Sequence, residues 1–182
     1  MYDIYSQCPE FSTEVITLRL TSDEDTEELL KCYSDKDAVP FFNADNCNGD
    51  DFYYTSLERM QQAVDFWNYS YQSKQFVRMT IVYNQTKEKI GTIEMFNRGI
   101  TPHYGIHGVL RIDLRSQYER REVIEEVLDL ANQYFYEAFG VDYIITKAIK
   151  SAGERILALK SKGYVYLEQF ERPDYYGIKE TK

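Results

Sequence analysis

Apolar and polar residues alternate in several short segments, with the period of two that is typical of half-buried strands. Strands are therefore predicted, in order, at residues 15–20, 76–83, 89–96, 108–114, 141–148, 164–170 and 174–179. The short link NQTKE between the second and third of these contains turn residues and predicts an antiparallel hairpin.

Four other segments repeat apolar residues at spacings of three and four, which is the period of an amphipathic helix. They follow, in order, Ser22, Thr55, Ser116 and Ser151. The last three of these residues each open the Ser/Thr-x-x-Glu pattern of a capping box. The clearest helix follows residue 116, and Gly140 is placed to end it as a C-cap. Polar loops are expected at 43–51 and 97–105.

The order of the predicted elements is β, α, α, β, β, β, α, β, α, β, β, with no repeat and no break in composition. Strands separated by helices predict a single α/β (α+β) domain over residues 1–182, with residues 1–13 as an N-terminal extension. We expect a mixed, mostly antiparallel sheet of about six to seven strands flanked by about four helices.

Composition favours a cytoplasmic protein that binds neither nucleic acid nor membrane. The chain has 30 Asp and Glu against 21 Lys and Arg, a formal net charge of −9, and an acidic surface repels phosphate backbones. Three scattered cysteines and two histidines predict neither a disulfide framework nor a metal site. No basic N-terminal start or long apolar run indicates a signal peptide or a membrane span.

This order of elements, together with three stretches of sequence, resembles the GNAT superfamily of acetyl-CoA-dependent N-acetyltransferases. The likeness is strongest to the branch that acetylates ribosomal-protein N-termini. The stretches are ITLRLTSDED at 16–25, LRIDLRSQY at 110–118 and LKSKGYVY at 159–166. The resemblance spans about residues 14–180. It implies a GNAT-like domain that transfers an acetyl group from acetyl-CoA, as co-substrate, to the primary amine of a small molecule or a protein N-terminus by direct attack.

In such proteins a glycine-rich loop after the strand at 108–114 lets peptide N–H groups approach the diphosphate of acetyl-CoA. Here the two expected glycines are Arg120 and Glu122, and arginine side chains are expected to bind phosphate in their place. The alternative is an ordinary solvated first turn with a pair between Arg121 and Glu125. The resemblance assigns the cofactor contacts to Ile112, Asp113, Leu114, Arg115, Glu119, Arg120, Arg121, Glu122, Val123 and Ile124.

Glu94 and Asp113 are the candidate general bases, because each lies on a central strand and a carboxylate there can take a proton from the attacking amine. For Glu94 the alternative is a carboxylate on a solvated face or an edge. Leu159 occupies the position of the tyrosine that the family often uses as general acid, and Ala152 that of a frequent Asn. An acidic loop is expected near the acceptor, where it would suit an amine, and contains Asp45, Asp50 and Asp51.

The missing glycines, Asn and Tyr leave a second function open, in which the same scaffold is a non-catalytic binding or interaction module that has lost acetyl-CoA binding. A third is an acyltransferase that uses another acyl-CoA or a carrier. His103 and His107 are interpreted as surface residues and Cys47 as a free thiol. The chain is expected to be a monomer or a homodimer.

Overall fold

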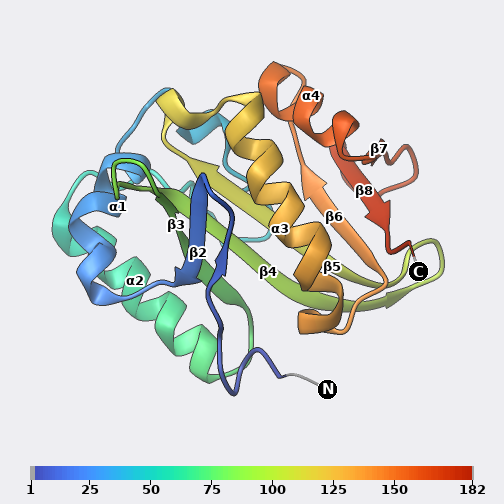
Figure 1. The fold of residues 1–182 in the computed structure, drawn as a ribbon, viewed down its shortest axis with the longest axis horizontal. Helices are drawn as coiled ribbons and strands as arrows, with labels where there is room; N and C mark the ends of the chain where they lie inside the picture. The colour runs from blue at the N-terminus through green and yellow to red at the C-terminus, as the bar shows by residue number, and fades with distance from the viewer. Residues whose placement is uncertain (1–2, 182) are drawn as a thin grey trace.

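The computed structural model describes residues 3–181, whose strands form one eight-stranded sheet in the order β1-β2-β3-β4-β5-β6-β8-β7 (Figure 1). The strands are β1 (Phe11–Ser12), β2 (Ile16–Leu20), β3 (Val77–Tyr83), β4 (Lys89–Thr101), β5 (Gly105–Leu114), β6 (Tyr143–Lys147), β7 (Val165–Tyr166) and β8 (Tyr175–Lys179). Within this sheet β5 and β6 run parallel and all other neighbours antiparallel. The predicted mixed, mostly antiparallel sheet is confirmed.

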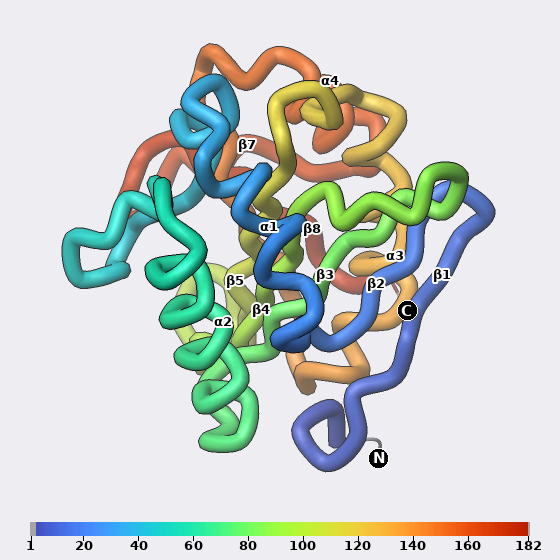
Figure 2. The backbone as a smooth tube through the Cα atoms, turned by 90° about the vertical axis from the view of Figure 1, so that its left-hand side faces the viewer, coloured from blue at the N-terminus to red at the C-terminus, as the bar shows by residue number. Residues whose placement is uncertain are grey.

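Four α-helices flank the sheet in two layers. They are α1 (Thr26–Tyr33), α2 (Leu57–Gln72), α3 (Arg121–Phe139) and α4 (Gly153–Ser161). The first two helices cover one face, and α3 covers the other with α4 packed beside it (Figure 2). Among the described residues, no helix has both the length and the apolar character that a bilayer crossing requires.

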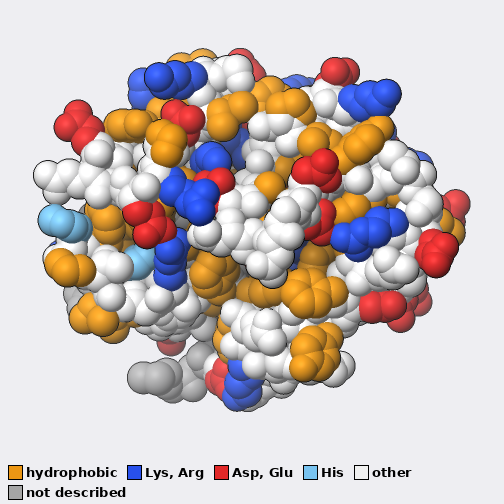
Figure 3. Space-filling view, turned by 180° about the vertical axis from the view of Figure 1, so that it is seen from behind, with side chains coloured by type: hydrophobic (Ala, Val, Ile, Leu, Met, Phe, Trp, Pro, Cys, Tyr) orange, Lys and Arg blue, Asp and Glu red, His pale blue; other side chains and the backbone are white. Residues whose placement is uncertain are grey.

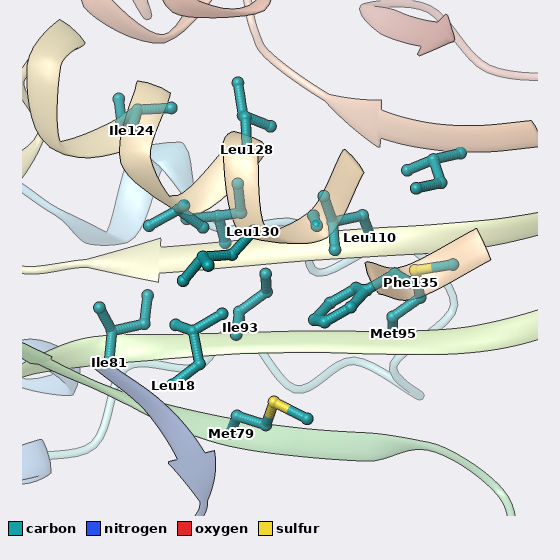
Figure 4. Close-up of a cluster of buried hydrophobic side chains, with 14 of the residues drawn as sticks. Leu18, Met79, Ile81, Ile93, Met95, Leu110, Ile124, Leu128, Leu130 and Phe135 are labelled. Atoms are coloured by element: carbon teal, nitrogen blue, oxygen red, sulfur yellow. The ribbon is translucent and has the colours of Figure 1, made fainter. Parts of the chain in front are cut away.

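The strand residues that face α3 are apolar and build the larger core. Ile93 of β4 lies between neighbours on β3 and β5, and Met95 pairs with Leu110 in the same layer. Leu130 and Phe135 of α3 lie between the helix and these strands (Figure 4). Each fully buried side chain of this size stabilises the fold by roughly 1.5–3 kcal/mol.

The opposite face of the same strands is charged. Because side chains alternate along a strand, residues that neighbour this core layer point toward α1 and α2. Arg78 lies opposite Glu94, and Thr92 opposite Asp113, in adjacent strands of the sheet. A sheet that is apolar on one face thus carries a buried polar layer on the other.

The predicted capping boxes of the last two helices are wrong. Helix α3 begins at Arg121 after a 3₁₀ turn at 116–118, and α4 begins at Gly153, with no side-chain cap on either. The reason is tertiary: Glu119 binds Arg155, and Glu154 accepts a hydrogen bond from the Arg121 N–H, so neither carboxylate turns back to cap its own helix. At α2 the cap is Ser56, one residue after the predicted one.

Two predictions about the strands also need correction. The loop expected at 97–105 is mostly strand, because a bulge at Asn97/Gly99 lets the β4–β5 ladder continue to Thr101. The strand expected at 164–170 ends at Tyr166, since the chain then turns back. In residues 3–13, which precede β2, the side chains of Ile4 and Phe11 are buried in the core. Gly140 ends α3 in the left-handed conformation (φ 62°), as predicted.

Candidate functional site

The polar layer is organised around the Arg78 side chain, which is 2% exposed. Its Nε and Nη2 donate to Glu94 Oε2 at 2.9 and 2.6 Å, and Arg111 Nη1 donates to the other oxygen of Glu94 at 2.8 Å. Burial alone would lower the pKa of Arg78, but the Glu94 carboxylate and its other partners raise it well above the usual value. Glu94 thus uses both oxygens to hold two guanidinium groups.

Asp113, the second candidate base, lies deeper. Its Oδ2 accepts from Tyr33 OH at 2.8 Å and from Arg78 Nη1 at 2.9 Å, and the residue is 2% exposed. Burial raises the pKa of Tyr33 well above its usual value, so this hydroxyl remains a donor. The structure brings Glu94 and Asp113 together on one guanidinium, but Asp113 does not line the cavity described next.

A cavity of about 530 Å³ lies over this layer, under α2 and the loop that precedes it. The Trp67 ring packs 4.4 Å from the Arg78 guanidinium at its floor. Seen from the side opposite α3, basic and acidic side chains lie next to one another among hydrophobic ones (Figure 3). The aromatic lining consists of Phe52, Tyr54, Phe66, Trp67, Phe76, Phe96 and Tyr175. A cavity of this size, apolar with a few fixed charges, is typical of small-molecule sites.

The loop at 43–51, expected near the acceptor, has its acidic side chains largely paired. Asp45 binds Lys147 at 2.9 Å, and Asp50 binds Arg59 at 2.6 Å, while Asp51 is exposed and lines no part of the cavity. Burial would raise the pKa of Asp45, but hydrogen bonds from Lys147 and Tyr175 lower it. Four arginines and three carboxylates line the cavity, so the expectation of an acidic groove is wrong.

Beside this cavity the parallel strands part. The β5–β6 ladder ends at Leu110/Thr146, whereas β5 continues to Leu114 and stays paired with β4. The predicted contact residues Ile112, Asp113 and Leu114 lie on this free end of β5, and their side chains are buried. Of the predicted cofactor site, the peptide groups of these three residues thus lie along the edge of β5 that β6 no longer covers.

The turn that follows is filled by the chain's own carboxylates. Asp35, from the loop after α1, accepts from the Ser116 N–H at 2.8 Å, and Glu154 of α4 accepts from the Arg121 N–H at 3.0 Å. The N–H groups of Val123 and Ile124 both donate to the carbonyl of Arg120. Three of the donors that a helix N-terminus can offer an anion, the N–H groups of Arg121, Val123 and Ile124, are therefore occupied.

Salt bridges take up the side chains of the turn as well. Glu119 and Arg155 form a bidentate pair at 2.7 Å with side chains only 7% and 3% exposed. Arg115 binds Glu88 at 3.2 Å, and Arg121 pairs with Glu125 at 2.7 Å, which is the alternative considered for it. Arg120 is half exposed, 3.4 Å from the exposed Glu122. In this arrangement the turn does not fit a diphosphate.

Sequence reasoning missed four residues that build the site: Tyr33, Arg78, Arg111 and Arg155. Arg78 and Arg111 did carry a signal, because each is an arginine flanked by apolar residues in a predicted strand. A charge in such a position is either exposed or paired in the interior, and a partner such as Glu94 on the neighbouring strand indicates the second case. Asp35 had no such signal, since it lies in a loop.

The two histidines and Cys47 lie in different surroundings. His103 is exposed, but His107 is wrongly predicted as a surface residue, because it is fully buried on β5. Burial lowers the pKa of His107. Cys47 is a free thiol, as expected, and burial raises its pKa. Within residues 3–181 no cluster of three His, Cys, Asp or Glu is arranged to hold a metal ion.

Comparison with known proteins adds to this geometry. The family model described as "Acetyltransferase (GNAT) domain" matches residues 16–151. A curated protein from Bacillus subtilis (strain 168), "Uncharacterized N-acetyltransferase YoaA", is 25% identical over 144 residues, which cover 75% of this chain and 71% of that protein.

Solved structures share the fold at low identity. A GNAT-family acetyltransferase from Bacillus anthracis has a TM-score of 0.70 and 14% identity, covering 94% of this chain and 99% of that one. Ribosomal-protein-S5-alanine acetyltransferase from Vibrio fischeri has a TM-score of 0.71 and 14% identity, covering 94% and 97%. RimL, a ribosomal L7/L12 alpha-N-protein acetyltransferase solved with coenzyme A, has a TM-score of 0.70 and 10% identity, covering 94% and 98%.

Proposed function

The chain belongs to the GNAT acetyltransferase family, and from that premise we propose that it transfers the acetyl group of acetyl-CoA to a primary amine. The observation that carries the proposal is the position of the cavity, whose lining includes Val109 and Arg111, beside the free end of β5. An acceptor held there lies next to a strand edge, where a thioester can be held in reach.

The proposed reaction is a direct attack without a covalent enzyme intermediate. The amine nitrogen bonds to the thioester carbonyl carbon, and the sulfur leaves as a thiol. Peptide N–H groups on the free end of β5, from Ile112 to Leu114, are the proposed donors to the carbonyl oxygen as negative charge develops on it. The role proposed for the cavity is to hold the amine close to the thioester, because most of the catalysis in such a reaction comes from bringing the two reactants together in the right orientation.

The proton of the attacking amine is proposed to leave to water. The three carboxylates that line the cavity are each paired with an arginine or a lysine, and both oxygens of Glu94 already accept from arginines. Glu94 and Asp113 are then structural supports of the acceptor site. The dependence of kcat/KM on pH is expected to follow the ionisation of the acceptor amine, because only the neutral amine attacks.

A protein N-terminus is the acceptor that we favour among amines. Two of the structural neighbours are named for acetylating ribosomal proteins. The cavity of about 530 Å³ holds one or two side chains of a peptide end, and its aromatic walls suit an apolar first residue. Small-molecule amines that are similar in size to such a peptide end are the other candidate acceptors.

A second function is favoured by one specific observation. Because Asp35 and Glu154 fill the turn after β5, the fold is also compatible with a binding module that has no acetyl-CoA reaction. In that case the aromatic cavity binds its ligand and releases it unchanged.

Two measurements on the full chain separate these functions. Release of free thiol from acetyl-CoA, measured with a panel of short peptides and small amines, is expected with at least one acceptor. Melting in the presence of CoA at 100 times its Kd is expected to reflect about 2.7 kcal/mol of added stability. No thiol release and no shift at millimolar CoA would favour the binding module.

A further inference from the structure

Two carboxylates from distant parts of the chain close the turn where the family places the diphosphate of its donor. Asp35 follows α1 and reaches the Ser116 N–H, and Glu154 lies in the first turn of α4 and reaches the Arg121 N–H. A helix N-terminus attracts anions through its free N–H groups and its dipole. Here the protein supplies the anions itself.

A buried ion pair fixes the two supports of this closure. Arg155 binds Glu119 with two hydrogen bonds and donates a third, at 3.2 Å, to the carbonyl of Phe41. The pair therefore connects the turn to α4 and to the loop between α1 and α2, the two segments that contain Glu154 and Asp35. The pair thus holds the two backbone segments that contain these carboxylates against the turn.

The arginines near the turn do not offset the negative charge of these carboxylates, because they have carboxylate partners of their own. Arg115 binds Glu88, Arg121 binds Glu125, and Arg120 lies beside Glu122. A diphosphate entering the turn would come near the Asp35, Glu119 and Glu154 carboxylates, while each nearby guanidinium already has a carboxylate partner. Like charges at such short range repel even near a protein surface.

We propose that Asp35 and Glu154 determine donor specificity: they exclude the diphosphate from the turn, so that the chain holds its acyl donor by the pantetheine arm and not by the nucleotide half. The inference rests on the proposed acetyl transfer, and it names the part of the donor that is recognised. The pantetheine arm is neutral and meets none of these carboxylates. The free end of β5 offers it peptide groups, as Ile112 to Leu114 lie beyond the β6 ladder.

The test compares two probes on three forms of the full chain by isothermal titration calorimetry. The probes are CoA and pantetheine, which share the arm but differ in the nucleotide and the diphosphate. The forms are the wild type, Asp35→Asn/Glu154→Gln, and the control Glu137→Gln/Glu168→Gln. Both double variants raise the formal net charge by two, and the control residues are exposed. The amides keep an oxygen that accepts from the turn, so the fold should persist, and melting curves check this.

The wild type and the control are expected to bind CoA and pantetheine with similar affinity. Asp35→Asn/Glu154→Gln is expected to bind CoA at least about tenfold more tightly, with pantetheine unchanged. Glu154→Gln alone, at an exposed position, should give part of this gain and serves if the double variant unfolds. Equal CoA affinity in all forms, or an equal gain in the control, would overturn the inference.

Failure of this inference and failure of the proposed function give different results. A wild type that releases thiol from acetyl-CoA, with CoA affinity unaffected by the substitutions, keeps the transferase and removes the specificity role of Asp35 and Glu154. A wild type that releases no thiol, while the double variant gains CoA affinity, removes the transferase and keeps the carboxylates as the cause of exclusion.

Discussion

Arg78 is the residue on which the buried polar layer of the sheet depends. Its guanidinium group donates hydrogen bonds to Glu94, Asp113, Tyr33 and Thr92, so all three of its nitrogens have a partner. A buried charge is tolerated only with such partners, and the loss of one partner costs more than the pair contributes. Glu94 is therefore expected to stabilise the fold around Arg78, whether or not it takes part in any reaction.

Glu94→Gln tests this assignment. The substitution leaves two buried guanidinium groups facing a neutral amide, and we expect the free energy of unfolding to fall by about 3 kcal/mol. Urea denaturation measures the change. Glu122→Gln, which breaks only an exposed pair, should change stability by less than about 0.5 kcal/mol. A similarly small effect of Glu94→Gln would show that Glu94 is free to act as a base.

At the scale of elements, the β4–β5 pair is the scaffold that fixes the site. Gly91 of β4 has no room for a side chain, because a Cβ there would lie 1.9 Å from the carbonyl oxygen of Asp113. The close approach keeps β4 against the last residues of β5, where the strand has lost its other neighbour. A glycine inside a strand often marks such a contact.

Gly91→Ala should separate these strands. We expect a loss of about 2 kcal/mol or more in the free energy of unfolding, since backbone and not a flexible side chain must move. Gly153→Ala is the matched control, because a Cβ there meets nothing within 4 Å at the start of α4, and it should be neutral or stabilising. Equal unfolding free energies for the two variants would contradict the close packing of β4 on β5.

Elements whose signals are local were predictable from the sequence, and those that depend on distant partners were not. Periodicity placed all four helices and most strands, and Gly140 marked the end of α3. The capping boxes failed because Glu119 and Glu154 bond across the fold. In the same way, the position of Glu94 on a predicted strand was enough to select it as a candidate. Its two arginine partners lie opposite it on the neighbouring strands, and the sequence does not give the register of those strands.

At the scale of the whole molecule, several groups respond to acid in the same direction. Burial alone would raise the pKa of Asp25, Asp35 and Asp45, but hydrogen bonds and ion pairs outweigh it and lower these values. For His107, burial itself lowers the pKa. A group with a lowered pKa binds fewer protons in the folded state than in the unfolded state. Stability therefore falls as the pH falls, wherever the unfolded state takes up a proton first.

His107 should produce the first part of this loss. Its ordinary pKa is 6.5 and its folded pKa is lower, so its contribution is complete above pH 6.5 and decreases below it as the unfolded state is protonated. We expect His107→Gln to reduce the loss of unfolding free energy between pH 7.5 and pH 5.5, measured by urea denaturation. His103→Gln, at an exposed position, is the control and should leave that loss as in the wild type.

Asp25 should produce a second loss at lower pH. This buried carboxylate binds Arg19 through both oxygens at 2.5 and 2.8 Å and also accepts from Ser22 N and Thr80 Oγ1. The ordinary pKa of 3.8 is lowered in the folded state, so the contribution is complete well above pH 3.8 and is lost as the pH falls through the folded pKa. Asp25→Asn is expected to cost about 2 kcal/mol at pH 7 and progressively less below pH 4. A cost that stays constant down to the acid transition would mean that Asp25 contributes by packing and not by its charge.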